Sequence, residues 1–389
     1  MQISENTTFI AKTFYGLENI LAEEIRKIGG TDIQVLNRAV HYKGDKELLY
    51  KSNVFLRTAL RILVPIKTFE AKSEDDIYWE ARKIRWEDLF LTDHSFMVDS
   101  TVHSEHIKHS QFAGLRFKDA IVDRFRDRLN KRPSVNKNNP DYKINLHVSQ
   151  THCTISLDSS GESLHKRGYK TKNVKAPLNE VLAAGLIIAS GWNQDSTFID
   201  PMCGSGTLPI EATLLANDIP PGIFRPNFGF KKWREFDRPL FNRITENINY
   251  MPHKNIPVLA NDISEEAMEI TRTNCENAEL EEAIQFSVQD FKDLQTEHYQ
   301  PGTVIINPPY DVKLKKENIR DFYKEIGDTL KQKFTNFDVW VFSSNLNALK
   351  HLGLHSDKKI TLYNGPLECK FNKYSIYKGS LKTKNKSLQ

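Results

Sequence analysis

Two short stretches combine residue types that could carry out chemistry. The first is Asp200-Pro201-Met202-Cys203-Gly204-Ser205-Gly206-Thr207, and the second, further along the chain, is Asn307-Pro308-Pro309-Tyr310. The first is typical of a loop that holds a nucleoside-bearing cofactor. The second is typical of a clamp for the exocyclic amine of a flat base. In this order they predict a methyl transfer from S-adenosylmethionine to a nucleobase nitrogen.

The first stretch follows an apolar segment and leads into a helical one, like a ligand-binding turn of a doubly wound sheet. Gly204 and Gly206 would let the backbone approach a ligand closely. No Lys follows the last Gly, which excludes a phosphate-cradling loop, and the spacing departs from dinucleotide-binding loops. Asp200 suits a cofactor that carries a sulfonium and an ammonium. The predicted cofactor loop runs from Asp200 to Thr207 and includes Met202.

Two further acids follow predicted strands. Asp262 could accept hydrogen bonds from a ribose diol, and Asp290 could accept one from an adenine amine. Each could instead cap a helix or belong to an ordinary loop. Together with Asp200 they form a series of acids at three successive strand ends, which favours a binding site.

The second stretch would activate a poor nucleophile, because the lone pair of an exocyclic amine is delocalised into the ring. The side-chain oxygen of Asn307 and the carbonyl of Pro308 could bind the two amine hydrogens and direct the lone pair at the methyl group. Pro308 and Pro309 would stiffen these acceptors, and Tyr310 could stack on an extruded base. The alternative is a Pro-Pro turn with an ordinary Asn and Tyr. Cys203 lies outside this motif, so we expect it to pack and not to act as a nucleophile.

The elements that would position these residues form an alternating α/β pattern. Residues 1–44 are predicted as a small N-terminal α/β domain, 45–158 as a second α/β domain that includes a helix over Leu48–Leu60, 159–180 as a linker and 181–378 as the chemical domain. In the chemical domain the predicted strands are Thr197–Asp200, Pro257–Asp262, Ile284–Val288, Thr303–Asn307, Phe337–Phe342, Lys359–Tyr363 and Tyr374–Tyr377. The last two are expected to form an antiparallel hairpin, and residues 379–389 a basic, disordered tail.

Composition narrows the class of protein. The chain has 389 residues and a formal net charge of +4. Its four cysteines form no CxxC pair, which argues against a metal site and against a disulfide framework. No apolar run is long enough to span a bilayer and Met1 to Ile10 lacks a signal-peptide pattern, so we expect no membrane association and a cytoplasmic location.

Basic residues exceed acidic ones between residues 108 and 143, where Lys118 to Leu129 is predicted to be a helix. Such a patch is typical of a surface that grips a polyanion, although a solvated surface would look similar. The bases that we expect to contact RNA here are Lys118, Arg124, Arg126, Lys131 and Arg132.

The two chemical motifs and the order of domains resemble THUMP-domain RNA guanine-N2 methyltransferases, and most closely the amino-terminal half of the bacterial 23S ribosomal RNA guanine-N2 methyltransferase. Further stretches that carry the resemblance are Leu164–Tyr169, Ala176–Glu180, Ser190–Trp192, Asn364–Cys369 and, for the THUMP domain, Phe117–Asp123. The resemblance implies a ferredoxin-like domain, a THUMP domain that captures RNA, and a Rossmann-like, seven-stranded class I methyltransferase domain.

The resemblance also implies site residues. Cofactor contacts would come from Asp200, Cys203, Gly204 and Gly206, with Asp262 and Asp290 on the nucleoside. Lys166, Arg167 and Pro177–Glu180 would line the entrance to the site, where Lys166 and Arg167 would contact the RNA. An aromatic, basic insert at 224–234 could stack on RNA or could be a packed loop. Some relatives carry a second fused methyltransferase and make two modifications, and this chain would make only the first.

The leading hypothesis is methylation of a guanine N2 in 23S ribosomal RNA. A sibling enzyme acting on guanine in tRNA and an adenine-N6 methyltransferase are alternatives that use the same amine chemistry. A non-catalytic RNA-binding assembly factor is a third alternative, which the intact loop and clamp disfavour. The oligomeric state does not follow from the sequence.

Overall fold

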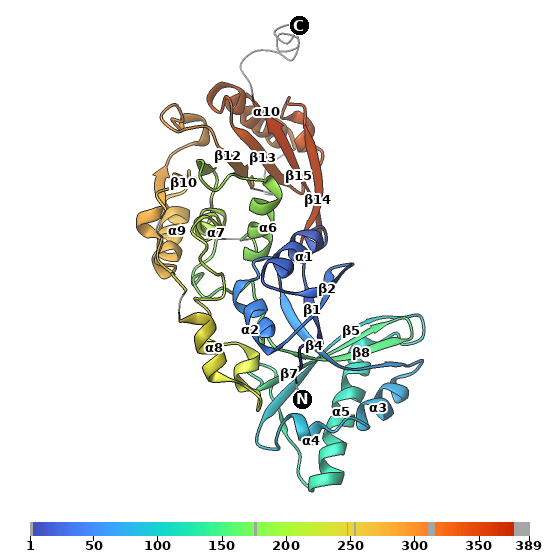
Figure 1. Cartoon of the computed structure of the whole chain (residues 1–389). Coiled ribbons are helices and arrows are strands. Elements are labelled where there is room, and N and C mark those ends of the chain that lie inside the picture. The colour runs from blue at the N-terminus through green and yellow to red at the C-terminus, as the bar shows by residue number, and fades with distance from the viewer. Residues whose placement is uncertain (1–2, 175–176, 247, 253, 310–315, 377–389) are drawn as a thin grey trace. The chain divides into compact units, whose positions relative to one another are not determined.

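The chain divides into two compact units, which Figure 1 shows in a computed structural model that describes residues 3–174, 177–246, 248–252, 254–309 and 316–376. The N-terminal unit comprises Met1–Thr13, Leu21–Leu164 and Arg225–Asn247. The C-terminal unit comprises Phe14–Ile20, His165–Phe224 and Ile248–Gln389. Each unit therefore contains a segment from a distant part of the sequence.

The N-terminal unit is built on an eight-stranded sheet with the order β2-β3-β1-β4-β8-β7-β5-β6. Its strands are β1 (Thr7–Lys12), β2 (Thr31–Leu36), β3 (Ala39–Gly44), β4 (Arg61–Glu70), β5 (Ser95–His103), β6 (Ser134–Val135), β7 (Tyr142–Ser149) and β8 (His152–Asp158). Its helices are α1 (Glu18–Lys27), whose first turn belongs to the other unit, α2 (Lys46–Phe55), α3 (Glu74–Arg82), α4 (Trp86–Leu89), α5 (Ser110–Leu129), the 3-10 turn η1 (Gly229–Lys232) and α8 (Arg238–Thr245). Because β4 pairs with both β1 and β8, the sheet is continuous across residue 44. The domain boundaries at 44 and 158 remain predictions.

Helix α2 ends at Phe55, whereas the sequence pattern predicted a helix that continues to Leu60. The backbone N–H groups of Arg57 and Thr58 donate instead to the carboxylate of Glu24, at 2.9 and 3.0 Å. This distant acid replaces the acceptors that a further helical turn would have supplied. Helix α5 differs in the other direction, since it begins at Ser110 and not at Lys118.

The aromatic insert packs within the N-terminal unit. Phe228, Phe230 and Trp233 are buried, and the Phe230 ring stacks on Tyr50 of α2 with centroids 4.5 Å apart. Of the two alternatives for this segment, the packed loop fits these three rings, since buried rings offer no face to a base.

The C-terminal unit has a seven-stranded sheet with the order β11-β10-β9-β12-β13-β15-β14. Its strands are β9 (Phe198–Asp200), β10 (Val258–Asp262), β11 (Gln285–Val288), β12 (Thr303–Ile306), β13 (Asp338–Ser343), β14 (Lys358–Asn364) and β15 (Leu367–Ser375). Its helices are α6 (Glu180–Ser190), α7 (Thr207–Ala216), α9 (Glu265–Asn277), α10 (Lys316–Lys333) and the 3-10 turns η2 (Glu281–Ala283), η3 (Phe291–Asp293) and η4 (Ala348–His351). The first five strands are parallel, and β14 and β15 form the predicted antiparallel hairpin.

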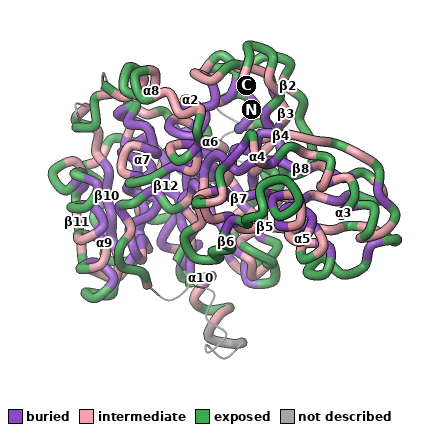
Figure 2. Tube along the Cα trace, turned by 90° about the horizontal axis from the view of Figure 1, so that it is seen from below, coloured by how far each residue is buried: buried purple, intermediate pink, exposed green. Residues whose placement is uncertain are grey.

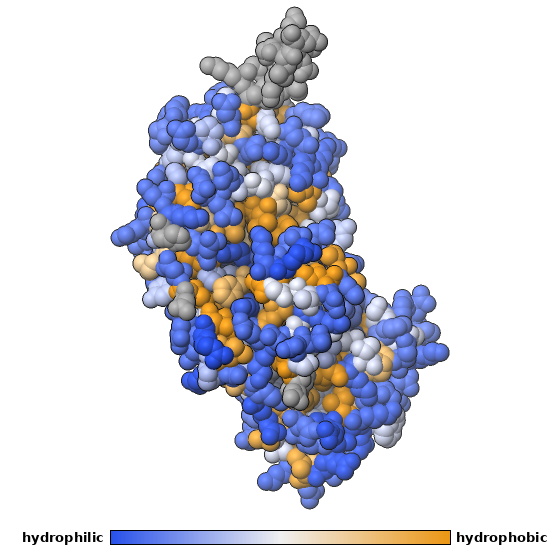
Figure 3. All heavy atoms as spheres, viewed as in Figure 1, coloured by the Kyte–Doolittle hydropathy of each residue, from blue (hydrophilic) through white to orange (hydrophobic). Residues whose placement is uncertain are grey.

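The last strand begins earlier in the chain than predicted. It was placed at Tyr374–Tyr377, but β15 begins at Leu367, directly after a turn at Gly365 with φ +61°. Buried residues run through β10, β12 and α7 (Figure 2), whereas hydrophilic side chains cover much of the visible surface (Figure 3). Among the described residues no helix is long and apolar enough to cross a membrane.

Candidate active site

The two chemical motifs meet at the point where the strand order of the C-terminal sheet reverses. Strand β9 pairs in parallel with β10 on one side and with β12 on the other, with Ile199 opposite Val304. Asp200 ends β9, and Asn307 directly follows β12. In doubly wound sheets, ligands bind in the crevice beyond the carboxyl ends of the strands at such a reversal.

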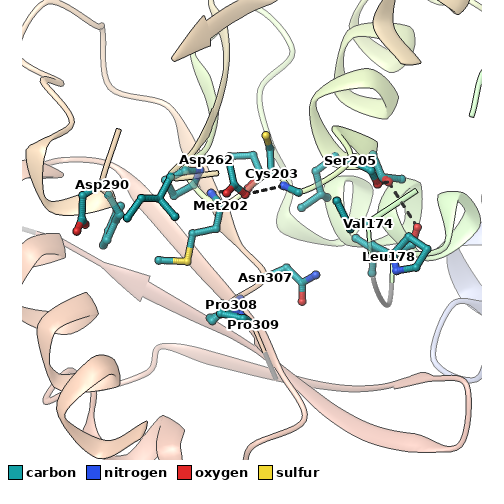
Figure 4. Close-up of a pocket in the computed structure, with 18 of the residues that line it drawn as sticks. Val174, Leu178, Met202, Cys203, Ser205, Asp262, Asp290, Asn307, Pro308 and Pro309 are labelled. Atoms are coloured by element: carbon teal, nitrogen blue, oxygen red, sulfur yellow. Dashed lines mark hydrogen bonds between the residues drawn. The ribbon is translucent and has the colours of Figure 1, made fainter. Parts of the chain in front are cut away.

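A cavity of about 700 Å³ lies at this position, within the size range of small-molecule sites. Its lining includes predicted residues from all four strand ends, namely Asp200, Met202, Cys203, Gly204, Thr207, Asp262, Asp290, Asn307, Pro308 and Pro309. Figure 4 shows Asn307 and Pro308 on the side of the cavity opposite the cofactor loop, with Asp290 at one end. Pro177 and Leu178 also contribute to the lining. Tyr310, the predicted stacking residue, lies outside the described residues.

The cavity favours a positively charged ligand. Its described lining contains the carboxylates of Asp200, Asp262, Asp290 and Glu325 and no Lys, Arg or His. Burial, and to a lesser extent the neighbouring Asp262, raises the pKa of Asp200 well above its ordinary value. A cationic ligand would relieve this penalty by stabilising the ionised carboxylate. The lining therefore fits a sulfonium and an ammonium better than a pyrophosphate.

Asp262 and Asp290 both hold local backbone. The two carboxylate oxygens of Asp262 accept the N–H groups of Gly204 at 2.9 Å and Ser264 at 3.0 Å. Asp290 accepts the N–H of Lys292 at 3.1 Å and its ammonium at 3.1 Å. The capping and ligand roles are compatible, because each carboxylate oxygen has two lone pairs and both residues line the cavity.

Helix α9 supports the cofactor loop from behind, a role that the sequence analysis missed. The Thr271 hydroxyl donates to the Gly204 carbonyl at 2.9 Å, and the Asn274 side chain donates to the Ser205 carbonyl at 3.0 Å. Both side chains are buried. Their signal in the sequence is polar residues on the buried face of an amphipathic helix, at i and i+3.

Asn261 is a second missed residue. Its side-chain amide N–H groups donate to the carbonyls of Pro201 at 3.0 Å and Gln289 at 3.1 Å, and its backbone carbonyl accepts the N–H of Cys203 at 2.9 Å. Asn261 thus joins the cofactor loop to the loop after β11. The available signal was a polar residue inside the apolar strand Val258–Asp262.

Cys203 has the environment of a packing residue. Its sulfur lies 3.5 Å from the Met268 sulfur and 3.7 Å from the Thr271 hydroxyl. Burial, together with the charges of Asp200 and Asp262, raises the pKa of this thiol well above its ordinary value. A thiol that resists ionisation is a poor nucleophile.

The position of Arg167 contradicts one of the expected RNA contacts. Its side chain is 1% exposed and its Nε lies 3.3 Å from Glu211, which also accepts the Tyr169 hydroxyl at 2.9 Å. A guanidinium buried against a carboxylate cannot reach a phosphate at the surface, so the expectation that Arg167 binds RNA is wrong for this structure. Lys166, the adjacent predicted contact, is exposed.

Lys170 extends this buried charge cluster to the cofactor loop. Its ammonium donates to the Leu178 carbonyl at 2.8 Å and the Thr207 hydroxyl at 3.0 Å, and lies 3.6 Å from Glu180. Burial lowers the pKa of Lys170 and raises the pKa of Glu180. Since Leu178 and Thr207 both line the cavity, Lys170 fixes two parts of its wall.

The predicted RNA contacts on α5 have acidic neighbours within the same unit. Lys118 pairs with Asp119 at 2.7 Å, Arg126 with Asp123 at 3.3 Å, and Arg124 with Glu87 of α4. Lys131 and Arg132, beyond the end of the helix, are exposed. The net charge of this surface is therefore smaller than the count of its bases suggested.

Known protein families match three consecutive parts of the chain. The profile described as the RlmL ferredoxin-like domain matches residues 8–63, the THUMP domain matches 71–158, and the RMKL-like methyltransferase domain matches 167–373. The cavity lies wholly within the last of these ranges.

Individual relatives give the same pattern. A Synechocystis protein named provisionally as an RNA methyltransferase is 35% identical over 95% of this chain and 97% of its own length. Ribosomal RNA large subunit methyltransferase K/L of Syntrophotalea carbinolica is 34% identical over 95% of this chain, which spans about half of that relative, 53%. A solved structure of a protein named provisionally as a methyltransferase, complexed with SAH, has a TM-score of 0.85 and 28% identity, and the match covers 97% of this chain and 100% of that one.

Proposed function

This chain belongs to the family of RMKL-like methyltransferases that carry a THUMP domain, and on that premise we propose that it methylates the exocyclic N2 amine of a guanine in 23S ribosomal RNA. The predicted family, the fold of ferredoxin-like, THUMP and methyltransferase domains, and S-adenosylmethionine as cofactor are confirmed. The base, its nitrogen, the RNA and the roles of individual residues belong to the proposal.

One observation carries the proposal. Asn307 and Pro308 lie in the same cavity as the acidic cofactor loop, on its opposite side (Figure 4). A base amine held by these two residues would therefore face the position of the cofactor. The ribosomal RNA substrate is supported by the name of the Syntrophotalea relative, although this chain covers about half of that protein.

Residues on the cofactor side would bind and orient. Asp200 and Asp262 would favour the positive charge of the cofactor, and Asp290 would accept a hydrogen bond from its nucleoside. Gly204 leaves room for close approach, because a Cβ on it would have only ordinary contact, 3.6 Å, with Val174. When bound, S-adenosylmethionine supplies an electrophilic methyl group on a sulfonium.

Residues on the substrate side would prepare the amine. The Asn307 side-chain oxygen and the Pro308 carbonyl would each accept one amine hydrogen, which draws the nitrogen toward tetrahedral geometry and aims its lone pair. The nitrogen–carbon bond would form as the carbon–sulfur bond breaks, and one amine proton would then leave to solvent. Positioning and preorganised acceptors would supply the rate, so no strong general base is required.

The test uses labelled S-adenosylmethionine with RNA from cells that lack this gene, followed by separation of ribosomal and transfer RNA and nucleoside mass spectrometry. We expect the label as N2-methylguanosine in the large ribosomal RNA. Label on adenine or in tRNA would overturn the proposed base or substrate and keep the amine chemistry. Unlabelled RNA, also when ribosomal assembly intermediates are supplied, would overturn the proposal.

A further inference from the structure

The sheet of the N-terminal unit has one face covered by helices and a second face, which we call the open face, that is partly exposed except at the buried Leu63 and Asp158 of its central strands. Helix α2 packs against β3 and β4, and α5 packs against β5. Along β1, Phe9 and Ala11 point to the covered face and are fully buried, whereas Lys12 lies on the open face and is partly exposed. Strand β7 repeats the pattern, since Leu146 is fully buried and His147 is partly exposed.

Strand register places three bases from different strands on this open face. Ile10, two residues before Lys12, pairs with His41 on β3 and with Leu63 on β4. Directly opposed residues share a face of a sheet, as do residues two apart on one strand. Leu63 pairs with Asp158 on β8, and Thr154, four residues earlier on β8 and therefore on the same face, pairs with His147 on β7. Lys12, His41 and His147 therefore project from one side of the sheet.

Acids on this face are already matched by other bases. Asp99 lies 3.6 Å from Lys143, and Asp158 pairs with Arg61. In the part of the chain that the structure describes, the side-chain nitrogens of Lys12, His41 and His147 have no hydrogen bond and no ion pair with an acid. We call these three residues the open-face bases: Lys12 contributes a positive charge without an acidic partner, and the two imidazoles contribute ring N–H groups that can donate hydrogen bonds.

The open-face bases also act on one another. Burial and the nearby Arg38 lower the pKa of Lys12. Burial lowers the pKa of His41 and of His147, and Lys12 contributes to both shifts. The charge of Lys12 is therefore felt by both histidines, which lie on different strands. The desolvated Lys12 cation, which has no acidic partner, reduces stability, and an external anion would relieve this cost. The lowered pKa values leave both imidazoles neutral near pH 7, where each still has one ring N–H that can donate to a phosphate oxygen.

We propose that the open face of the N-terminal sheet, with Lys12, His41 and His147 as its contacts, binds the phosphate backbone of the RNA substrate. The inference rests on the proposed function for the identity of the polyanion. The RNA-binding surface would then be the open face of the sheet. It would not be α5 on the opposite face, where Lys118, Arg124 and Arg126 are paired with acids. Phosphate contacts fix the register of an RNA without reading its sequence.

The experiment measures binding of the full-length protein to a fluorescein-labelled RNA hairpin with a single-stranded tail, over a series of KCl concentrations. The test variant is Lys12→Gln with His147→Gln, and the matched control is Lys27→Gln with Lys72→Gln, two exposed bases of the same unit. We expect the test variant to raise the Kd roughly fivefold and to lower the salt slope by about one, with little change in the control. Calorimetric binding of S-adenosylhomocysteine should stay unchanged in both, which shows that the C-terminal unit is intact.

A second readout separates a binding role from a structural one. Because Lys12 is desolvated beside Arg38, Lys12→Gln should keep or raise the thermal midpoint of the free protein while it weakens RNA binding. Wild-type affinity and an unchanged salt slope in the test variant would overturn the inference, whatever the control shows. RNA binding that depends on Lys12 without any methyl transfer to guanine would support the inference and overturn the proposed function. A wild-type protein that fails to bind the hairpin overturns the inference even if methylation of ribosomal RNA is observed.

Discussion

Gly206 lies so close to Thr271 that a Cβ built on the glycine would be 2.7 Å from the threonine Cγ2 and 3.2 Å from its hydroxyl. Gly206 also has φ +76°, which side-chain-bearing residues rarely adopt. The same threonine hydroxyl donates to the Gly204 carbonyl at 2.9 Å. The turn of the cofactor loop is therefore fitted to α9 as well as to the cavity.

Gly206→Ala should lower the free energy of unfolding by about 1–3 kcal/mol, because a methyl group is forced into a filled space. It should also weaken binding of S-adenosylhomocysteine, since the loop must shift to accommodate the methyl group. Chemical denaturation and titration calorimetry on the purified protein measure the two effects.

Gly191→Ala is the matched control for this variant. Gly191 has φ +69°, but nothing lies within 4 Å of its Cβ position. It shares the backbone strain, about 1–2 kcal/mol, without the contact. Thr271→Ser in the Gly206→Ala protein keeps the hydroxyl, removes the clashing methyl and should restore binding. Equal binding losses in the two alanine variants, with no rescue by serine, would show that the Thr271 contact is unimportant.

The site could be predicted from the sequence because the ends of strands can be recognised from local patterns of apolar and polar residues. An apolar strand followed by Asp200 or by Asn307 places both residues on one sheet edge, whichever helices intervene. The reason that position 206 must be a glycine could not be predicted from the sequence. The sequence suggested close approach of a ligand, whereas the structure places Thr271, from a helix beyond the next strand, in that space.

Charge was the property least predictable from the sequence. Arg124 finds Glu87 and Arg167 finds Glu211, and in each case the acid lies far away in the chain. A local excess of bases therefore overstated the positive potential of α5. The unmatched Lys12 stood in a strand of ordinary composition, where only the register of the folded sheet reveals its neighbours.

Asp200→Asn should stabilise the cofactor-free protein at neutral pH. Burial raises the pKa of Asp200 in the folded state, so the folded protein holds this proton more tightly than the unfolded chain does. Its contribution to stability is fully present below the unfolded pKa of about 4 and is lost as the pH rises through the folded pKa. The variant, which cannot ionise here, should gain in thermal midpoint over the wild type as the pH rises above about 4.

The control for Asp200 is Asp195→Asn, a nearby exposed carboxylate in the same unit. Its thermal midpoint should follow the wild type at every pH. Calorimetry should show weaker binding of S-adenosylmethionine to Asp200→Asn, because the acid that favours its positive charge is gone. A stability difference from the wild type that is the same at pH 4 and pH 8 would contradict the assignment of burial as the cause.

Lys170→Met should destabilise the C-terminal unit by about 3 kcal/mol, because it leaves the buried Glu180 without its partner. The double variant Lys170→Met with Glu180→Gln removes both charges and should recover a large part of this loss. Denaturation of the wild type, the two single variants and the double variant gives the coupling energy. An additive double variant would mean that the 3.6 Å pair contributes nothing to stability.

Asn307→Ala should lower kcat by about 10²–10³-fold, the range for loss of one preorganised hydrogen-bonding group. RNA affinity and binding of S-adenosylhomocysteine should stay near the wild-type values, because the proposed contact is to the reacting amine. Single-turnover transfer of labelled methyl groups to RNA measures the chemical step. Asn347→Ala, an exposed asparagine in the same unit, is the control and should retain full activity. A wild-type rate for Asn307→Ala, with both affinities intact, would show that Asn307 does not hold the amine.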